Sequence, residues 1–174
     1  DVRLTRDGAH VLSREDWVLD ATGKRWEVRG QAWAELRKLD IGSRFAARFM
    51  GEKLLSLPEC LELCKGKLNL RLNCCDANPD QLASEILSAG MERQVVVFAD
   101  LDTLQRVRSA SGDKVALMAE WLPRFGMTDW LVTNHLTAVE VDASALTGRI
   151  RQRLGRAGVR VLVRFSNQSD RPEF

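Results

Sequence analysis

The sequence has 174 residues, of which 45% are hydrophobic and 29% charged, and its formal net charge is +2. A chain of this length fits a single domain with a substantial buried core, and its composition is ordinary for a soluble globular protein. No apolar run approaches the ~18 residues of a membrane span. The small net charge argues against a dedicated nucleic-acid binder. We therefore expect neither a transmembrane segment nor a nucleic-acid partner.

Residues 1–16 predict a strand, a tight turn at Asp7-Gly8 and a second extended run. Asp-Gly supplies the positive φ that such a turn requires. The second run ends in polar residues, Arg14-Glu15-Asp16, as expected for a strand tip. His10 follows the turn, and a lone histidine there is expected on the surface. The chain opens on this segment without an initiator Met or a lead-in, which we interpret as a start inside a larger domain.

Beyond this hairpin, short apolar runs alternate with longer helical patterns. A parallel sheet with helices outside it is the expected result. An open doubly wound sheet and most of a (β/α)8 barrel both fit, but no G-x-G-x-x-G motif follows the first strand. Strands are predicted over Leu68–Leu72, Val95–Ala99, Val115–Met118, Trp130–Thr133, Ala138–Val141 and Val159–Arg164, and helices over Gln81–Ala89, Asp102–Ser109 and Ser144–Ala157.

Four cysteines stand at positions 60, 64, 74 and 75. Their spacing departs from the paired C-x2-C pattern typical of zinc sites. We favour reduced thiols used as small core residues, which weakly indicates a reducing compartment. The five tryptophans are expected in core and helix packing, and the basic run 149–156 on a solvated helix face.

Three stretches together resemble the glycerophosphodiester phosphodiesterase family. The run DVRLTRDGAHVL at residues 1–12 is similar to the family's D-V-x-x-T-x-D-G-x-x-V-V. The run ELRKLDIGSRF at 35–45, followed by GEKLLSLPECLEL at 51–63, is similar to a segment containing G-E-x-I-P-T-L-E-E-V-L-E-L. The run KGKLNL at 65–70 leads into the strand that carries I-E-L-K in active members. After residue 100 the resemblance is mainly architectural.

The resemblance implies a (β/α)8 TIM barrel. On this alignment the chain is one domain over residues 1–174, cut at both ends, and covers roughly the second to the seventh of the barrel's eight strands. The family's first strand, with His-Arg-Gly, and its last, with Thr-Asp-x-Pro, are outside it. Such an excerpt leaves sheet edges that missing strands or a partner chain would cover.

Active family members hydrolyse phosphodiesters with two histidines and a divalent metal held by carboxylates. The resemblance aligns Asp1 with the Asp of the E-x-D metal pair, and Arg14-Glu15 with a catalytic His-Asp. It aligns Arg71 and Asn73 with the Glu and Lys of I-E-L-K, and Arg164 with the aromatic of W-T-V-N. Arginine stays protonated and makes a poor general base. No catalytic residue is therefore assigned, Asp1 is a weak metal ligand at most, and no cofactor is expected.

Arg14, Arg71 and Arg164 are expected at the strand ends, on one rim of the barrel. With Asn73 they form the candidate binding site for a phosphate-bearing small molecule. The alternative, which we slightly favour, is that each arginine pairs with a nearby acid such as Glu15 or Asp76.

Three functions stay open. The first is a non-catalytic phosphate- or lipid-headgroup-binding, or structural, module. The second is an active glycerophosphodiester hydrolase with Mg²⁺ or Ca²⁺, using Asp1, Glu15 or His135 together with residues outside the sequence. The third is an unrelated α/β binding domain. A cytoplasmic location is expected in each case.

Overall fold

The computed structural model describes residues 1–74, 76–122 and 126–165. Its amino-terminal half contains two antiparallel hairpins. Strands β1 (Val2–Leu4) and β2 (His10–Leu12) form the first, and Gly8 turns it with a φ of 82°. Strands β3 (Trp17–Leu19) and β4 (Arg25–Glu27) form the second. The predicted Asp-Gly hairpin is thus confirmed, whereas the second hairpin had no predicted counterpart.

Three helical segments follow the hairpins: α1 (Trp33–Leu36), the 3₁₀ turn η1 (Ala47–Phe49) and α2 (Leu57–Cys64). Helix α2 begins at a capping box, in which Ser56 and Glu59 satisfy each other's backbone N–H groups. Its buried side, which includes Leu57 and Leu61, joins the main core.

The remainder is a five-stranded parallel sheet in the order β5-β6-β7-β8-β9. This order follows the chain, so each strand lies beside the next, as in a (β/α)8 barrel. A bridge between Val2 and Cys74 places β1 next to the end of β5. The strands are β5 (Leu70–Asn73), β6 (Val95–Phe98), β7 (Ala116–Glu120), β8 (Ala138–Asp142) and β9 (Arg160–Arg164).

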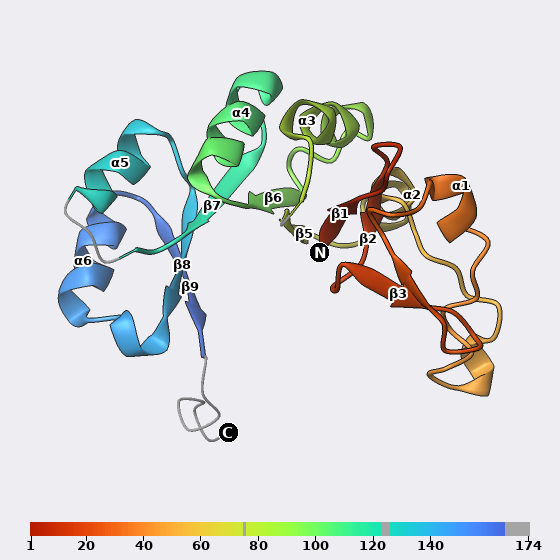
Figure 1. The fold of residues 1–174 in the computed structure, drawn as a ribbon. Helices are drawn as coiled ribbons and strands as arrows, with labels where there is room; N and C mark the ends of the chain where they lie inside the picture. Colours follow the sequence, from red (N-terminus) through yellow and green to blue (C-terminus); the bar gives the residue numbers. More distant parts are fainter. Residues whose placement is uncertain (75, 123–125, 166–174) are drawn as a thin grey trace.

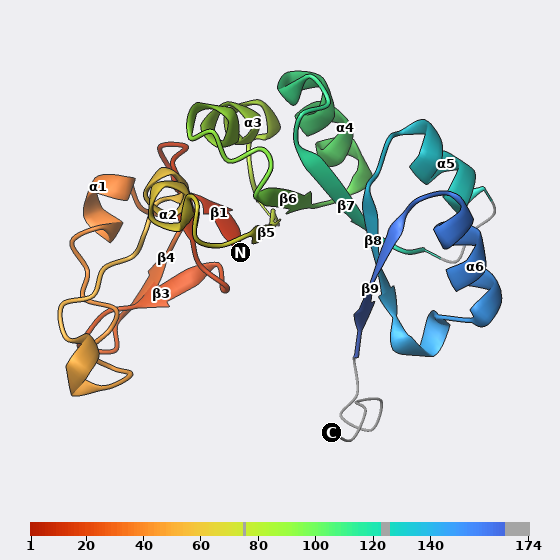
Figure 2. The ribbon, with the colours of Figure 1, turned by 180° about the vertical axis from the view of Figure 1, so that it is seen from behind.

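Four helices connect these strands and lie along one side of the curved sheet (Figures 1 and 2). They are α3 (Pro79–Ser88), α4 (Leu101–Ser111), α5 (Met127–Thr133) and α6 (Gly148–Arg156). The main core lies between helices and sheet, with Leu82, Leu104 and Leu154 each fully buried. The architecture is a partial (β/α)8 barrel, as the sequence predicts.

The predicted strand at Trp130–Thr133 is wrong, because these residues end helix α5. The aromatic and β-branched residues suggested a strand. Their burial has the helical period instead: Met127 and Leu131, four residues apart, are buried, while Val132 is 49% exposed. The predicted helix Ser144–Ala157 is divided into the 3₁₀ turn η2 (Ala143–Ala145) and α6, which Thr147 caps.

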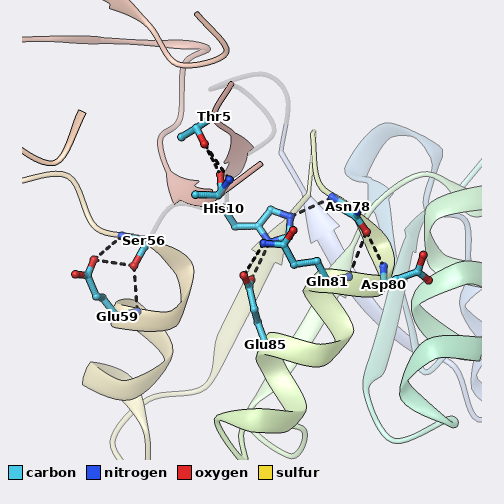
Figure 3. A network of polar contacts seen from close by, with 9 residues as sticks. Thr5, His10, Ser56, Glu59, Asn78, Asp80, Gln81 and Glu85 are labelled. Atoms are coloured by element: carbon cyan, nitrogen blue, oxygen red, sulfur yellow. Dashed lines mark hydrogen bonds and ion pairs between the residues drawn. The ribbon is translucent and has the colours of Figure 1, made fainter. Parts of the chain in front are cut away.

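The prediction that His10 lies on the surface is wrong. It is 1% exposed, and it links the first hairpin to the start of α3 (Figure 3). Its Nδ1 lies 2.7 Å from a carboxylate oxygen of Glu85, and its Nε2 accepts a 3.0 Å hydrogen bond from the Asn78 backbone N–H. This pattern assigns the ring proton to Nδ1, which donates to Glu85.

No helix among the described residues is long and apolar enough to cross a membrane.

Candidate functional site

The parallel register divides the sheet side chains between two faces. Residues such as Leu72, Val97 and Val139 face the helices and are at most 4% exposed. The alternate positions face the other way, which in a closed barrel is the interior. Polar residues gather on this inner face towards the strand ends, and they are Arg71, Asn73, Glu120, Glu140, Asp142 and Arg164.

Glu140 lies at the centre of an ion-pair network on this face. Its side chain is 8% exposed, and its two carboxylate oxygens receive Arg71 from β5 and Arg164 from β9. Arg71 also lies over the Phe98 ring, 4.2 Å from its centroid. The network therefore connects the first strand of the sheet to the last.

Arg164 contacts three acids. Its guanidinium lies 2.8 Å from Glu120, 3.3 Å from Glu140 and 3.8 Å from Asp142. The hydrogen bond with Glu120, together with the charges of all three acids, raises the pKa of Arg164. Arg71 and Arg164 thus pair with acids, although not with those that the sequence suggested. Asp76 pairs with Arg29 instead.

Asp1 and Asn73 lie next to this network. The Asn73 amide donates to the Asp1 carboxylate, across the bridge between Val2 and Cys74. Within the described residues, no group of three His, Cys, Asp or Glu side chains is arranged to hold a metal ion.

Arg14 lies beyond the end of β2, in the same region of the fold, because the neighbouring Ser13 N–H bonds to the Asp1 carbonyl. Its side chain is 89% exposed, and Glu15 is 3.9 Å away. Among the described residues, Arg14 therefore has the most distant acidic partner of the three predicted arginines.

His135 is not at the barrel mouth. It precedes β8 and therefore lies at the amino ends of the parallel strands, opposite the strand ends that carry Asp142 and Arg164. The mistaken strand at 130–133 had placed this histidine after a strand rather than before one.

Sequence reasoning missed the acids of the network. Glu140 and Asp142 alternate with buried valines in the segment Val139–Asp142, and Glu120 ends an otherwise apolar strand. Charged residues at alternate positions of a buried strand indicate a polar inner face, and this signal was available in the sequence.

A separate loop over residues 41–53 is organised by Asp40. Its carboxylate accepts hydrogen bonds from the backbone N–H groups of Gly42, Ser43 and Gly51, and from the Ser43 hydroxyl at 2.6 Å. A Cβ on Gly42 would lie 2.1 Å from the Phe49 carbonyl oxygen, so this close approach requires glycine.

We expect this loop to lose its order on strong acidification. The Ser43 hydroxyl, followed by the backbone donors, lowers the pKa of Asp40 from 3.8 to about 2. Its stabilising contribution is therefore complete above the ordinary value and is lost as the pH falls through about 2. The amide shifts of Ser43 and Gly51 should report this transition in NMR spectra. An Asp40→Asn variant, which cannot titrate there, should not show it, and an identical transition in both proteins would contradict the assignment.

Among the described cysteines, Cys60 and Cys64 carry free thiols. Cys64 and Cys74 are buried. Burial, with a smaller contribution from Cys64, raises the pKa of Cys60 to about 11. Cys75 lies outside the described residues.

The chain was compared with known proteins. Residues 1–117 match the model of the glycerophosphoryl diester phosphodiesterase family. A glycerophosphodiester phosphodiesterase from Caldanaerobacter subterraneus subsp. tengcongensis is 36% identical over 67 residues, which are 38% of this chain and 28% of that protein.

Solved structures agree on the fold. A glycerophosphodiester phosphodiesterase from Agrobacterium tumefaciens matches with a TM-score of 0.80 at 21% identity, covering 97% of this chain and 73% of that one. An Oleispira antarctica phosphodiesterase, in complex with its product sn-glycerol-3-phosphate, matches with a TM-score of 0.71 at 20% identity, covering 97% and 72%. Since the family match extends over residues 1–117, which are most of the chain, the chain belongs to the glycerophosphoryl diester phosphodiesterase family.

Proposed function

We propose that this chain is a non-hydrolytic member of its family, which binds a phosphate-bearing ligand at the strand ends rather than cleaving it. The observation that carries the proposal is the Arg71–Glu140 pair. Where the family resemblance implies a metal-binding glutamate, this chain has a guanidinium already engaged by a buried carboxylate.

The side chains at this position do not fit a divalent cation. Mg²⁺ and Ca²⁺ prefer clusters of oxygen ligands, chiefly carboxylates. Here Asp1 pairs with the Asn73 amide, and Arg71 brings a positive charge to the neighbouring inner-face position of the same strand. We derive no metal-dependent step for this site.

Arg14 is the best-supported contact for the phosphate. A phosphate that reached Arg71 or Arg164 would compete with Glu140, which is already bound to both guanidinium groups. Arg14 is exposed and has one acid 3.9 Å away, so its fork of N–H donors remains accessible. Asn73, Arg71 and Arg164 then serve mainly to shape and neutralise the adjoining inner face.

The purified protein should release no glycerol phosphate from glycerophosphocholine above background, with or without Mg²⁺ or Ca²⁺. The double variant Arg14→His/Glu15→Asp should not rescue hydrolysis, because Arg71 still occupies the position of the metal ligand and residues of one catalytic unit are not additive. Titration with glycerol 3-phosphate should give saturable binding that Arg14→Ala weakens.

Hydrolysis by a rearranged site is the competing function. Metal-dependent release of glycerol phosphate, abolished by Asp1→Asn, would replace our proposal with it. Absence of both hydrolysis and glycerol 3-phosphate binding would leave a structural module.

The free thiols of Cys60 and Cys64 support a reducing compartment, and we propose the cytoplasm. We also propose that a further strand or a partner chain covers the free edge of β9, since this strand is paired on one side in the described sheet.

A further inference from the structure

A largely apolar cavity of about 470 Å³ lies between the two hairpins, the 41–53 loop and the adjoining Leu54. Val18 and Leu54 belong to a second buried cluster and are 8% and 5% exposed. Phe45 also belongs to the lining and is 82% exposed. The lining consists of Leu12, Ser13, Arg14, Glu15, Trp17, Val18, Leu19, Ile41, Arg44, Phe45 and Leu54.

The polar residues of this largely apolar lining are Ser13, Glu15 and two arginines. Arg14 is the exposed residue at the end of the first hairpin. Arg44 has no ion pair with another described residue, and its guanidinium rests against Gly23, where a Cβ would lie 2.6 Å from Nη1. Asp20 organises the turn that contains Gly23 by accepting hydrogen bonds from Thr22 and Lys24.

We propose that this cavity binds the chain of a single-chain amphiphile with an anionic head group, which pairs with Arg44 and Arg14. The cavity volume falls within the range of small-molecule sites, and apolar linings with few polar groups are typical of them. The lining contains two guanidinium groups and one carboxylate, that of Glu15, and this net positive charge favours a negatively charged head group. Fatty acids and lysophospholipids share this chemistry.

The exposure of Phe45, a lining residue, favours a ligand with an apolar chain. Exposed aromatic rings are unfavourable in water, and a bound chain would cover this ring together with the partly exposed Trp17 and Leu19. Asp40 and Gly42 fix the conformation of the 41–53 loop. Because this loop carries both Arg44 and Phe45, the two side chains are positioned before a ligand binds.

Octanoate, decanoate and dodecanoate, each kept below its critical micelle concentration, test the chain requirement by calorimetric titration. Burial of each added methylene contributes about 0.8 kcal/mol, so affinity should rise about fourfold per methylene until the cavity is filled. A short-chain lysophosphatidate and the matching monoacylglycerol distinguish phosphate from carboxylate heads, and anionic from uncharged ones.

Matched variants locate the site. Arg44→Glu should weaken dodecanoate binding at least tenfold, whereas Arg48→Glu, in the same loop but outside the lining, should change it less than twofold. Phe45→Ser should likewise weaken binding, with Met50→Ser as its control, since Met50 is 72% exposed and does not line the cavity. A brominated dodecanoate should quench tryptophan fluorescence, and Trp17→Phe should remove that quenching while Trp130→Phe does not.

The amphiphile site and the proposed function share Arg14. The amphiphile site requires only that the ligand binds, whether or not the protein hydrolyses phosphodiesters. Glycerol 3-phosphate binding without dodecanoate binding would overturn the amphiphile site and leave the proposed function intact. Equal losses in Arg44→Glu and Arg48→Glu would overturn it too. So would binding to anionic vesicles without binding to monomeric amphiphiles, which would identify the exposed loop as a membrane contact.

Discussion

Replacing His10 with alanine is expected to lower the free energy of unfolding by about 3 kcal/mol. The imidazole is buried, and its removal leaves a cavity between the first hairpin and helix α3. It also leaves the Asn78 backbone N–H without its acceptor and Glu85 without one of its two donors. Both losses occur where two segments distant in the sequence meet, so helix α3 should detach more readily from the hairpin.

Chemical denaturation measures this loss, and the other histidine of the sequence is a suitable control. His135 is exposed, and its φ of 54° suits asparagine, so His135→Asn should change stability by less than about 0.5 kcal/mol. His10→Gln offers a carbonyl oxygen to the Asn78 N–H and should recover part of the loss. A His10→Ala variant as stable as the native protein would mean that the contacts of His10 with Glu85 and Asn78 make no net contribution to the free energy of unfolding.

His10 marks the point at which sequence reasoning fails. Strands such as Val95–Phe98 and helices such as Pro79–Ser88 have local signals, namely an apolar run and an Asn-Pro start, so they could be predicted. The burial of His10 depends on Glu85, 75 residues away in the sequence. No local pattern encodes such a contact, since burial of a polar ring becomes favourable only once its partners are in place.

The candidate site was predictable in position but not in electrostatics. Strand order placed Arg71 and Arg164 on one face, as expected from a parallel sheet. The sequence could not say which acid would reach them. The pairing depends on the curvature of the sheet, which brings Arg71 on β5 within reach of Glu140 on β8 although two strands lie between them.

Glu140→Ala is expected to cost about 2 kcal/mol of stability. Removing one partner of a buried ion pair usually costs more, but the Arg71 side chain is 37% exposed and solvent will offset part of the loss. Arg164 keeps Glu120 and Asp142, so the effect falls mainly on Arg71. Within the described part of the chain, Arg71 then retains its contact with the Phe98 ring. Thermal and denaturant unfolding of the two proteins measure the difference.

A second variant separates the pair's structural role from its charge. In Arg71→Leu/Glu140→Leu neither charge is left without its partner, and apolar replacement of a buried pair is often neutral or stabilising. We therefore expect the double variant to recover most of the stability lost in Glu140→Ala. Recovery would mean that the Arg71–Glu140 pair is not needed for the stability of the fold. The role of the pair would then be to keep the inner face polar at the strand ends, with Arg71 at the position of the metal ligand. A double variant less stable than Glu140→Ala would show instead that the Arg71 and Glu140 side chains support the inner face beyond their mutual pairing, and it would contradict this expectation.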